Sequence, residues 1–272
     1  MAANLEPVIK STTDALINTL VERRTLGLKG PSLKLPSLLC NLTSAFELQS
    51  AMSATWCQTH QDSVAGWKCL LPSAEKQVVA PIFASEVYDL SSLNLDVPPI
   101  AVWTNTGTAR IEPELVFVFN KPLLAAQSNI SNDDIDAAIG SVHLGLELIG
   151  GRFELPAECS FYELFADGLF NQGLVIGPAI DISQQGHVSE LTIALQCGEQ
   201  PPQIISGQHQ NNNAKAPLYW LVNFLHQKGI SIQSGDSIIT GSYAGVLDVP
   251  LGEKISISYQ GLGALTVTFC QK

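Results

Sequence analysis

Hydrophobic residues recur at three- and four-residue steps in two segments near the start of the chain. Residues 5–24 carry one such stripe and residues 43–60 carry another, so each segment is predicted to form a helix. The two stripes consist of Ile9, Leu16, Ile17, Leu20 and Val21, and of Phe46, Gln49, Met52 and Trp56. A third amphipathic helix is predicted over residues 216–228, with Pro217 in its first turn and Gly229 after its end.

Beyond residue 78 the pattern changes to β-branched and aromatic runs, which are typical of strands. The predicted strands are residues 78–83, 100–103, 112–119, 143–149, 174–176 and 187–196, followed by short strands between residues 237 and 269. Short helices are predicted from Ser131 to Val142, with Ser131 as N-cap, and after the capping box formed by Ser160 and Glu163. The polar, Asn-rich segment 203–215 is predicted to be a loop that acts as a lid. This order of elements indicates an α+β chain with one main sheet system.

The composition favours a globular chain that associates with copies of itself. With 272 residues the chain is long enough for one large domain or two small ones. Because hydrophobic residues make up 46% and charged residues only 14%, much of the surface is apolar or neutral, and we expect a homo-oligomer that covers it. The net charge of −11 repels phosphate backbones, which excludes nucleic acid as a partner.

Neither a membrane segment nor a metal-binding cysteine motif is found in the sequence. No stretch of about 20 apolar residues exists, no basic run suggests a membrane surface, and Glu6 falls where a signal peptide needs its apolar core, so we expect a cytoplasmic protein. The cysteines are Cys40, Cys57, Cys69, Cys159, Cys197 and Cys270. None forms a CxxC pair, so zinc is not expected, and their scattered spacing predicts that most are buried thiols in a reducing compartment.

Glu112 and Glu114 form the first candidate site. They lie in the segment from Arg110 to Phe119, whose Val and Phe residues predict a strand. Side chains two residues apart on a strand share a face, so the two carboxylates enter an apolar segment together and repel each other. A hard divalent cation such as Mg²⁺ or Mn²⁺ prefers oxygen ligands and would hold them. The alternative is a solvated strand face, and Pro113 indicates an edge or a bulge at this point.

Two further charged residues stand alone in apolar surroundings. Lys68 is the only charge in residues 65–73, and Glu147 is the sole acid in residues 143–149. A buried charge needs a partner, so the functional interpretation pairs Lys68 with the three acids. The alternatives are that Lys68 reaches the surface along its alkyl chain and that Glu147 forms a salt bridge with Arg152 on the next turn.

Residues 66–73 (GWKCLLPS), 112–114 (EPE) and 147–152 (ELIGGR) follow the order and spacing of three known motifs. They resemble the GYKIGLTS, Glu-x-Glu and EIVDSR motifs of the 2-hydroxypentadienoate (2-keto-4-pentenoate) hydratase and 4-oxalocrotonate decarboxylase family, within the fumarylacetoacetate hydrolase superfamily. The similarity continues at residues 220–223 (WLVN), 235–242 (GDSIITGS) and 261–263 (GLG), and so covers nearly the whole chain.

The resemblance implies an α+β fold with N-terminal helices and a mixed β-roll or barrel core of the fumarylacetoacetate hydrolase type. It further implies that Glu112, Glu114 and Glu147 bind Mg²⁺ or Mn²⁺ and that Lys68 is the catalytic acid/base. The C–C-bond hydrolases of the superfamily typically have Asp at the third ligand position. Glu147 therefore points to the hydratase and decarboxylase branch.

Residues around the expected site depart from the family pattern. The family's PDFG is PIFA at residues 81–84, EIVDSR has Gly150 in place of its Asp, and ADNASSG is ADGLFNQ at residues 166–172, which introduces Gly168. The residues expected to contact substrate are Leu70, Ile82, Phe83, Arg152, Phe170 and Asn171. Because Ile82 and Phe170 replace polar or smaller residues, the pocket is expected to prefer a hydrophobic substrate tail to a second carboxylate.

The function implied by the resemblance is that of a divalent-metal-dependent lyase. We expect a hydratase acting on a small 2-hydroxy-2,4-dienoate (2-oxo-4-enoate) acid, in chemistry of the aromatic-degradation type. The alternatives are a 4-oxalocrotonate-type decarboxylase and a family member that binds oxo acids without the usual activity. Residues 1–75 are expected to form a helical cap ending in the Lys68 strand, continuous with a β-rich catalytic core at residues 76–272.

Overall fold

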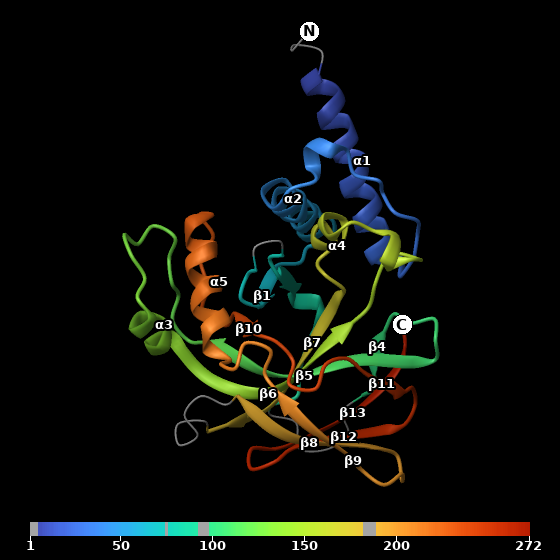
Figure 1. The fold of residues 1–272 in the computed structure, drawn as a ribbon, viewed down its shortest axis with the longest axis vertical. Helices are drawn as coiled ribbons and strands as arrows, with labels where there is room; N and C mark the ends of the chain where they lie inside the picture. The colour runs from blue at the N-terminus through green and yellow to red at the C-terminus, as the bar shows by residue number, and fades with distance from the viewer. Residues whose placement is uncertain (1–4, 74–75, 92–97, 182–188) are drawn as a thin grey trace.

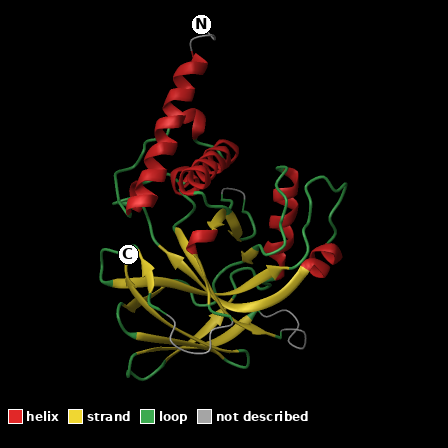
Figure 2. Cartoon of the chain, turned by 180° about the vertical axis from the view of Figure 1, so that it is seen from behind, coloured by secondary structure: helices red, strands yellow, loops and turns green. Residues whose placement is uncertain are grey.

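Two β-sheets and several helices make up the chain in a computed structural model (Figure 1). The structure describes residues 5–73, 76–91, 98–181 and 189–272, and for residues 5–10 it describes the backbone only. Helices from the first half of the chain gather at one end and the strands at the other, which confirms the expected fold class (Figure 2). No helix within these ranges is long and apolar enough to cross a lipid bilayer.

The two N-terminal helices pack against each other through part of their amphipathic stripes, whereas Phe46 joins the main core and Gln49 donates to the carbonyls of Val79 and Phe165. α1 (Leu5–Leu26) packs against α2 (Leu42–His60), which packs in turn against the short α4 (Phe161–Ala166). Ser44 N–H donates to the side chain of Asn41, which caps the start of α2. The side chains buried between these helices include Ile17, Leu20, Val21, Leu48, Met52 and Trp56. The helices therefore have an apolar core of their own, while the side chain of Ile9 lies outside the described residues.

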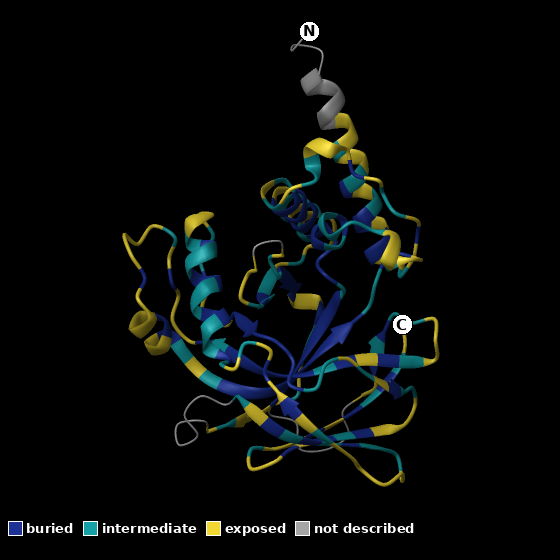
Figure 3. Ribbon diagram, in the orientation of Figure 1, coloured by how far each residue is buried: buried dark blue, intermediate teal, exposed yellow. Residues whose placement is uncertain are grey.

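The larger sheet carries the candidate chemistry. Its strand order is β2-β1-β10-β5-β6-β7-β3, and β11 pairs with one end of β5. The strands are β1 (Val64–Cys69), β2 (Val79–Phe83), β3 (Val87–Asp89), β5 (Thr108–Phe119), β6 (Ile139–Ile149), β7 (Asn171–Ile180), β10 (Ser237–Ile239) and β11 (Leu247–Pro250). Its central strands are almost entirely buried (Figure 3), as expected for a sheet covered on both faces.

The second sheet closes the lower face of the first in Figure 1. Its order is β4-β13-β12-β8-β9. The strands are β4 (Ile100–Val102), β8 (Glu190–Cys197), β9 (Gln203–Gln208), β12 (Lys254–Tyr259) and β13 (Gly263–Gln271). Inward residues of this sheet, among them Ile193, Ile257 and Phe269, are fully buried in the same core as β5 and β6. The remaining α-helices, α3 (Asn132–Ala138) and α5 (Lys215–Gln227), contact each other, and α3 also contacts β6 while α5 contacts β1.

Pro113 lies in the middle of β5, opposite Leu146 of β6. β5 pairs with β10 through residues 116–118 and with β11 through residues 108–111, so the intervening residues have no strand partner on that side. The carbonyl of Pro113 accepts a hydrogen bond from Tyr243 N–H across this gap. Because N–H and C=O of one strand residue point the same way, the missing N–H of proline costs no ladder bond. The predicted edge is thus a local gap inside a central strand.

Three predictions from the sequence need correction. The helix expected over residues 131–142 ends at Ala138, because Ile139 and the residues after it pair with β5. The loop expected over residues 203–215 is wrong for its first half, where β9 pairs with β8 along the sheet edge. The exposed face of β9 gave too weak a hydrophobic pattern to mark it as a strand. Residues 187–188 of the predicted strand 187–196 lie outside the described residues.

The third correction concerns the thiols. Cys69 is buried, but Cys40, Cys57, Cys159, Cys197 and Cys270 are only partly buried. All six are free. The Sγ atoms of several contact backbone carbonyls, as Cys159 does with Leu155, which satisfies a thiol without full burial.

Candidate functional site

The three expected ligand carboxylates come together on adjacent strands. Glu112 of β5 lies directly opposite Glu147 of β6, and Glu114 is two residues further along the same face. One carboxylate oxygen from each lies within 4.8 Å of the others. Glu114 and Glu147 are 2% and 1% exposed. The pairing register of two strands thus gathers three acids in a buried place.

Lys68 reaches this cluster from across the sheet. β10 and β5 lie between β1 and β6, a separation of about 14 Å in a flat sheet. Lys68 Nζ is nevertheless 2.7 Å from Glu147 Oε1 and donates to the carbonyl of Leu169 at 3.1 Å. The sheet therefore curls so that β1 faces β6. Both alternative interpretations are wrong: Lys68 does not reach the surface, with its side chain 12% exposed, and Glu147 does not pair with Arg152.

Neighbouring donors orient the two most buried carboxylates. Asn171 Nδ2 donates to Glu147 Oε1 at 2.8 Å, and Gly241 N–H donates to Glu114 Oε2 at 2.7 Å. The second oxygen of each carboxylate has no hydrogen-bond donor in the part of the chain that the structure describes. Gly241 has a φ of 120°, and a Cβ there would lie 2.5 Å from Leu70. Only glycine brings the backbone N–H close enough to Glu114 without strain.

The cluster has three carboxylates and only one lysine, and this imbalance shifts the pKa values of its groups. Burial and the neighbouring Glu147 raise the pKa of Glu112 to about 7, and burial with both other acids raises the pKa of Glu114 well above its ordinary value. Burial lowers the pKa of Lys68, but Glu147, Glu112 and Glu114 outweigh it, so the net shift is upward. Without a further cation the lysine is therefore protonated at neutral pH, Glu114 holds its proton, and Glu112 is about half protonated.

A cavity of about 220 Å³ opens over these groups. It is lined by Lys68, Cys69, Leu70, Val78, Glu112, Glu114, Glu147, Leu169, Phe170, Gln210, Gly241 and Ser242. All four expected catalytic and metal residues line it, together with two of the expected substrate contacts, Leu70 and Phe170. Apart from the charged groups its wall is mostly apolar. Burial also raises the pKa of Cys69 well above its ordinary value, so this thiol stays protonated.

The other expected substrate contacts lie away from this cavity wall. Ile82 and Phe83 are fully buried in β2, where Phe83 stacks on Trp56 of α2. Arg152 is held by Asp167, with its Nε 2.7 Å from Asp167 Oδ1. Asn171 lies behind Glu147, which it orients. A substrate contact by these four residues stays a prediction.

Sequence reasoning missed the residues that support the site from the segments after β9 and β10. Gly241 orients Glu114, and His209 holds the neighbouring backbone, with its Nε2 3.0 Å from the carbonyl oxygen of Thr240. Asn211 N–H donates to His209 Nδ1, so Nε2 carries the proton. Gln210, in the segment expected to form a lid, lines the cavity. Gly241 is visible in the sequence as part of the GDSIITGS motif, but the sequence does not show that its N–H donates to Glu114.

The donor set fits a hard divalent cation. Three carboxylates offer one oxygen each within 4.8 Å, two of them buried, and oxygen ligands suit Mg²⁺ and Mn²⁺. The raised pKa values of Glu112 and Glu114 show that the charge of the cluster is not compensated by Lys68 alone. A cation at this place would supply what is missing.

The curled mixed sheet and its acid–lysine centre define a class of enzyme folds built around an acidic metal site. The family model described as fumarylacetoacetate (FAA) hydrolase C-terminal matches residues 71–270. The chain belongs to the fumarylacetoacetate hydrolase family.

Similar proteins are found in sequence and in structure. The 4-oxalocrotonate decarboxylase of Pseudomonas putida is 24% identical over 160 residues, which cover 59% of this chain and 60% of that protein. The structure of 4-oxalocrotonate decarboxylase from Pseudomonas putida G7, complexed with magnesium and adipate, is similar with a TM-score of 0.75 at 18% identity, over 96% of this chain and 98% of that chain. Fumarylpyruvate hydrolase from Pseudomonas aeruginosa, in complex with Mn²⁺ and pyruvate, has a TM-score of 0.51 at 21% identity, over 73% and 81%. At these identities the structural likeness shows the fold.

Proposed function

We propose that this chain is a divalent-metal-dependent lyase acting on a small 2-hydroxy-2,4-dienoate or its 2-oxo tautomer. The observation that carries the proposal is the contact of Lys68 Nζ with Glu147 Oε1, inside a cavity that the other two acids also line. A proton-transfer group and a set of oxygen ligands are thereby placed against one small space. Mg²⁺ or Mn²⁺ held by Glu112, Glu114 and Glu147 would act as a Lewis acid toward the carboxylate and 2-oxygen of the substrate.

Asn171 and Gly241 keep the ligands in place during turnover. Each donates a hydrogen bond to one oxygen of a buried carboxylate and leaves the other oxygen without a donor among the described residues. Such supporting contacts fix ligand orientation and typically change metal affinity by about 10- to 100-fold. The acids are thus preorganised for a ligand rather than dispersed by their mutual repulsion.

Lys68 moves the proton in the proposed hydration. Its Nζ takes the proton from the 2-hydroxyl oxygen and delivers a proton to the far end of the conjugated chain, which converts the dienol into an enone. Water then adds to the enone carbon two bonds from the carbonyl. A general acid/base works best with a pKa near the working pH, and the three acids now hold the pKa of Lys68 up. We expect a bound cation, which offsets their charge, to lower it.

The cavity wall favours a substrate with an apolar end. Leu70, Val78 and Phe170 line it, and Lys68 is its only cationic side chain among the described residues. A second carboxylate buried there would therefore have no cationic partner, whereas an alkyl tail needs none. We propose that an alkyl dienoate is turned over faster than the corresponding diacid.

Decarboxylation is the second candidate, because 4-oxalocrotonate decarboxylase is found among the relatives in both sequence and structure. Here the bond to the distal carboxylate breaks, its electrons move along the enone to the 2-oxygen, and Lys68 protonates that oxygen while CO₂ leaves. An apolar wall would favour this step by destabilising the distal carboxylate. The two reactions thus need the same ligands and the same lysine.

One experiment separates the candidates. The purified chain is incubated with Mg²⁺ or Mn²⁺ and either 2-hydroxypenta-2,4-dienoate or 4-oxalocrotonate. Loss of dienol absorbance without CO₂ indicates the hydratase, and CO₂ release with appearance of dienol indicates the decarboxylase. The Glu114→Gln variant serves as the matched control for metal-dependent turnover. If neither substrate reacts with either metal, the proposed lyase function is wrong.

A further inference from the structure

A second cavity, of about 330 Å³, lies behind the candidate site, under the end of α1. It is lined by Arg23, Arg24, Gly27, Leu28, Lys29, Glu86, Trp103, Thr104, Asn105, Gly150, Gly151, Arg152, Gln172 and Gln271. We call it the arginine cavity. It shares no lining residue with the cavity over the three acids.

Positive charge is concentrated in this cavity, although the chain as a whole is acidic. The whole chain has 14 lysines and arginines and a net charge of −11. Four of those 14 cations line the arginine cavity, beside a single carboxylate, Glu86. Three of them are buried arginines: Arg23, Arg24 and Arg152 are 8%, 4% and 5% exposed. Buried guanidinium groups gathered in a chain this acidic indicate a place for an anion.

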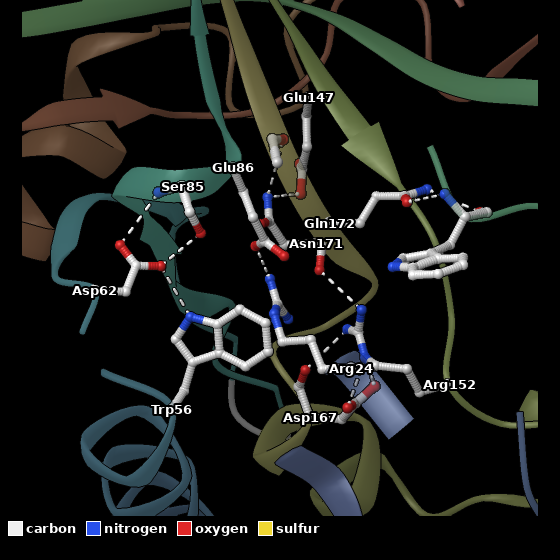
Figure 4. Close-up of polar contacts among 12 residues, drawn as sticks. Arg24, Trp56, Asp62, Ser85, Glu86, Glu147, Arg152, Asp167, Asn171 and Gln172 are labelled. Atoms are coloured by element: carbon white, nitrogen blue, oxygen red, sulfur yellow. Dashed lines mark hydrogen bonds and ion pairs between the residues drawn. The ribbon is translucent and has the colours of Figure 1, made fainter. Parts of the chain in front are cut away.

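The internal partners of these arginines do not balance them. Arg24 pairs with Glu86, and Arg152 pairs with Asp167 (Figure 4). Arg23 donates instead to the carbonyls of Pro31 and Arg152, and no carboxylate lies within ion-pair distance of it in the described ranges. The buried arginines therefore exceed their partner carboxylates by one positive charge.

The wall also has more donors than acceptors. Two N–H groups of lining residues, Arg24 Nε and Trp103 Nε1, are buried and have no acceptor among the residues that the structure describes. A buried donor without an acceptor costs about 1–3 kcal/mol. An oxyanion in the cavity would bring acceptors to this wall and neutralise the excess charge at once.

The shape of the cavity favours an organic anion over an inorganic one. The ring of Trp103 forms part of the wall and packs over Gly27, where a Cβ would lie 2.2 Å from the ring. Leu28 adds a further apolar side chain. A cavity of this volume holds a small molecule, and an indole face suits a planar, conjugated body.

From these observations we propose that the arginine cavity is a binding site for a small planar organic carboxylate, separate from the candidate catalytic site. Its carboxylate would be held by Arg23 and its neighbouring guanidinium groups, and its planar body would lie against Trp103. The proposal goes beyond the proposed function, since no group of the lyase reaction is needed for it.

The test uses the full chain, which is first freed of metal with a chelator, and the chelator is then removed by gel filtration. Sodium benzoate is the probe. The four tryptophans give four indole N–H signals in a ¹⁵N-labelled sample, and Trp103→Phe identifies one of them. Benzoate should move the Trp103 signal saturably. Sodium chloride at the same ionic strength should not.

Variants locate the anion. Arg23→Gln removes the unbalanced charge and should weaken binding by about tenfold or more, the usual effect of losing one charged hydrogen bond. Lys29→Gln, at an exposed position of the same wall, should weaken it about two- to fivefold and keeps the test decisive if Arg23→Gln does not fold. Arg110→Gln, a matched loss of charge outside the cavity, and Lys68→Met, in the other cavity, should leave affinity unchanged.

Three results would overturn the proposal. One is a Trp103 signal that does not move at all, and another is an affinity that Arg23→Gln and Lys29→Gln leave at the parent value. The third is saturation by inorganic phosphate but not by benzoate, which would assign the cavity to a different anion. Because none of these measurements involves turnover, they are independent of whether the lyase function holds.

Discussion

Two buried charge clusters lie back to back across the start of β7, and they are opposite in sign. The acidic site has three carboxylates and one lysine, whereas the arginine cavity has three buried guanidinium groups and two partner carboxylates. In the arginine cavity Arg24 and Arg152 each have a carboxylate of their own. In the acidic site only Glu147 has a cation within ion-pair distance, as far as the described residues show.

This difference separates paired charges, such as Arg24 with Glu86 and Arg152 with Asp167, which hold the fold together, from the carboxylates of the acidic site that lack a cation of their own. A buried ion pair stabilises its surroundings mainly because removal of one partner leaves the other uncompensated. Carboxylates that share one lysine instead raise each other's pKa and weaken the folded state until a cation arrives. The same substitution, Glu to Gln, should therefore have opposite effects on stability in the two clusters.

The largest effect is expected from Lys68→Met, which tests whether the one cation of the acidic site is chemical or structural. The substitution keeps the volume of the side chain and removes the titrating group. Turnover should fall by about 10²- to 10⁴-fold, the usual contribution of a general acid/base, while metal binding is retained. Steady-state kinetics and metal titration measure the two quantities. Lys76→Met, a control at an exposed position, should match the parent, and turnover of Lys68→Met at the parent rate would make Lys68 a packing residue.

Glu86→Gln tests the paired side of the comparison. It leaves the guanidinium of Arg24 buried without its carboxylate, and the free energy of unfolding should fall by about 3–5 kcal/mol. Urea denaturation followed by tryptophan fluorescence gives this value. Asp248→Asn removes a carboxylate from the exposed pair with Arg110 and should change little. Equal losses in both variants would show that burial of the Arg24 pair does not matter.

Glu114→Gln tests the unpaired side. Loss of a ligand should weaken metal binding by at least about 100-fold, more than loss of a supporting residue. The amide oxygen can still accept from Gly241, so the fold is retained. In the absence of metal the variant should be more stable than the parent at pH 8, because the raised pKa of Glu114 obliges the parent to take up a proton when it folds and the amide does not. Calorimetric metal titration and metal-free denaturation measure the two effects, and a less stable metal-free variant would contradict the comparison.

The smallest effect is the pH dependence of the metal-free protein. Glu112 has a pKa of about 7 in the folded chain, against about 4.3 for an unfolded glutamate. The folded state thus holds a proton that the unfolded state has lost, so this stabilisation is present below pH 4.3 and disappears as pH rises through 7. The free energy of unfolding should fall by on the order of 1–3 kcal/mol between pH 5 and pH 8. Glu112→Gln should flatten this slope, and saturating Mg²⁺ should reverse it.

The acids and the lysine of the site could be predicted from the sequence because each stands out from its neighbours. Lys68 and Glu147 are lone charges in apolar runs, and the two-residue spacing of Glu112 and Glu114 fixes a common face on any strand. Their convergence follows from strand pairing, in particular Glu112 opposite Glu147. The strongly periodic helices were predictable in the same way, because the local spacing of apolar residues indicates which face of each helix is buried.

Long-range partners could not be predicted. The choice between Arg152 and Lys68 as the partner of Glu147 depends on the curl of the sheet, which no local pattern encodes. The support of Glu114 by Gly241 joins residues 127 positions apart. Likewise the exposed edge strand β9 forms because it pairs with β8, and it has too few buried residues to show the hydrophobic pattern of a strand. The arginine cavity left no motif, because its parts come from α1, β7 and the segments around residues 103 and 151.

Asn171 and Gln172 are neighbours at the start of β7, yet each serves a different cluster. Asn171 donates to Glu147, while Gln172 bonds to the backbone of Trp103 and Ile149 beside the arginine cavity. Alternation along a strand ties the two contacts together: if a one-residue deletion in the turn at 168–170 shifted β7 by one position, Gln172 would take the place of Asn171 and Gly173 that of Gln172. Such a shift would remove both contacts at once, so it would disturb both sites, whereas a substitution at Asn171 or Gln172 changes the contacts of one site alone.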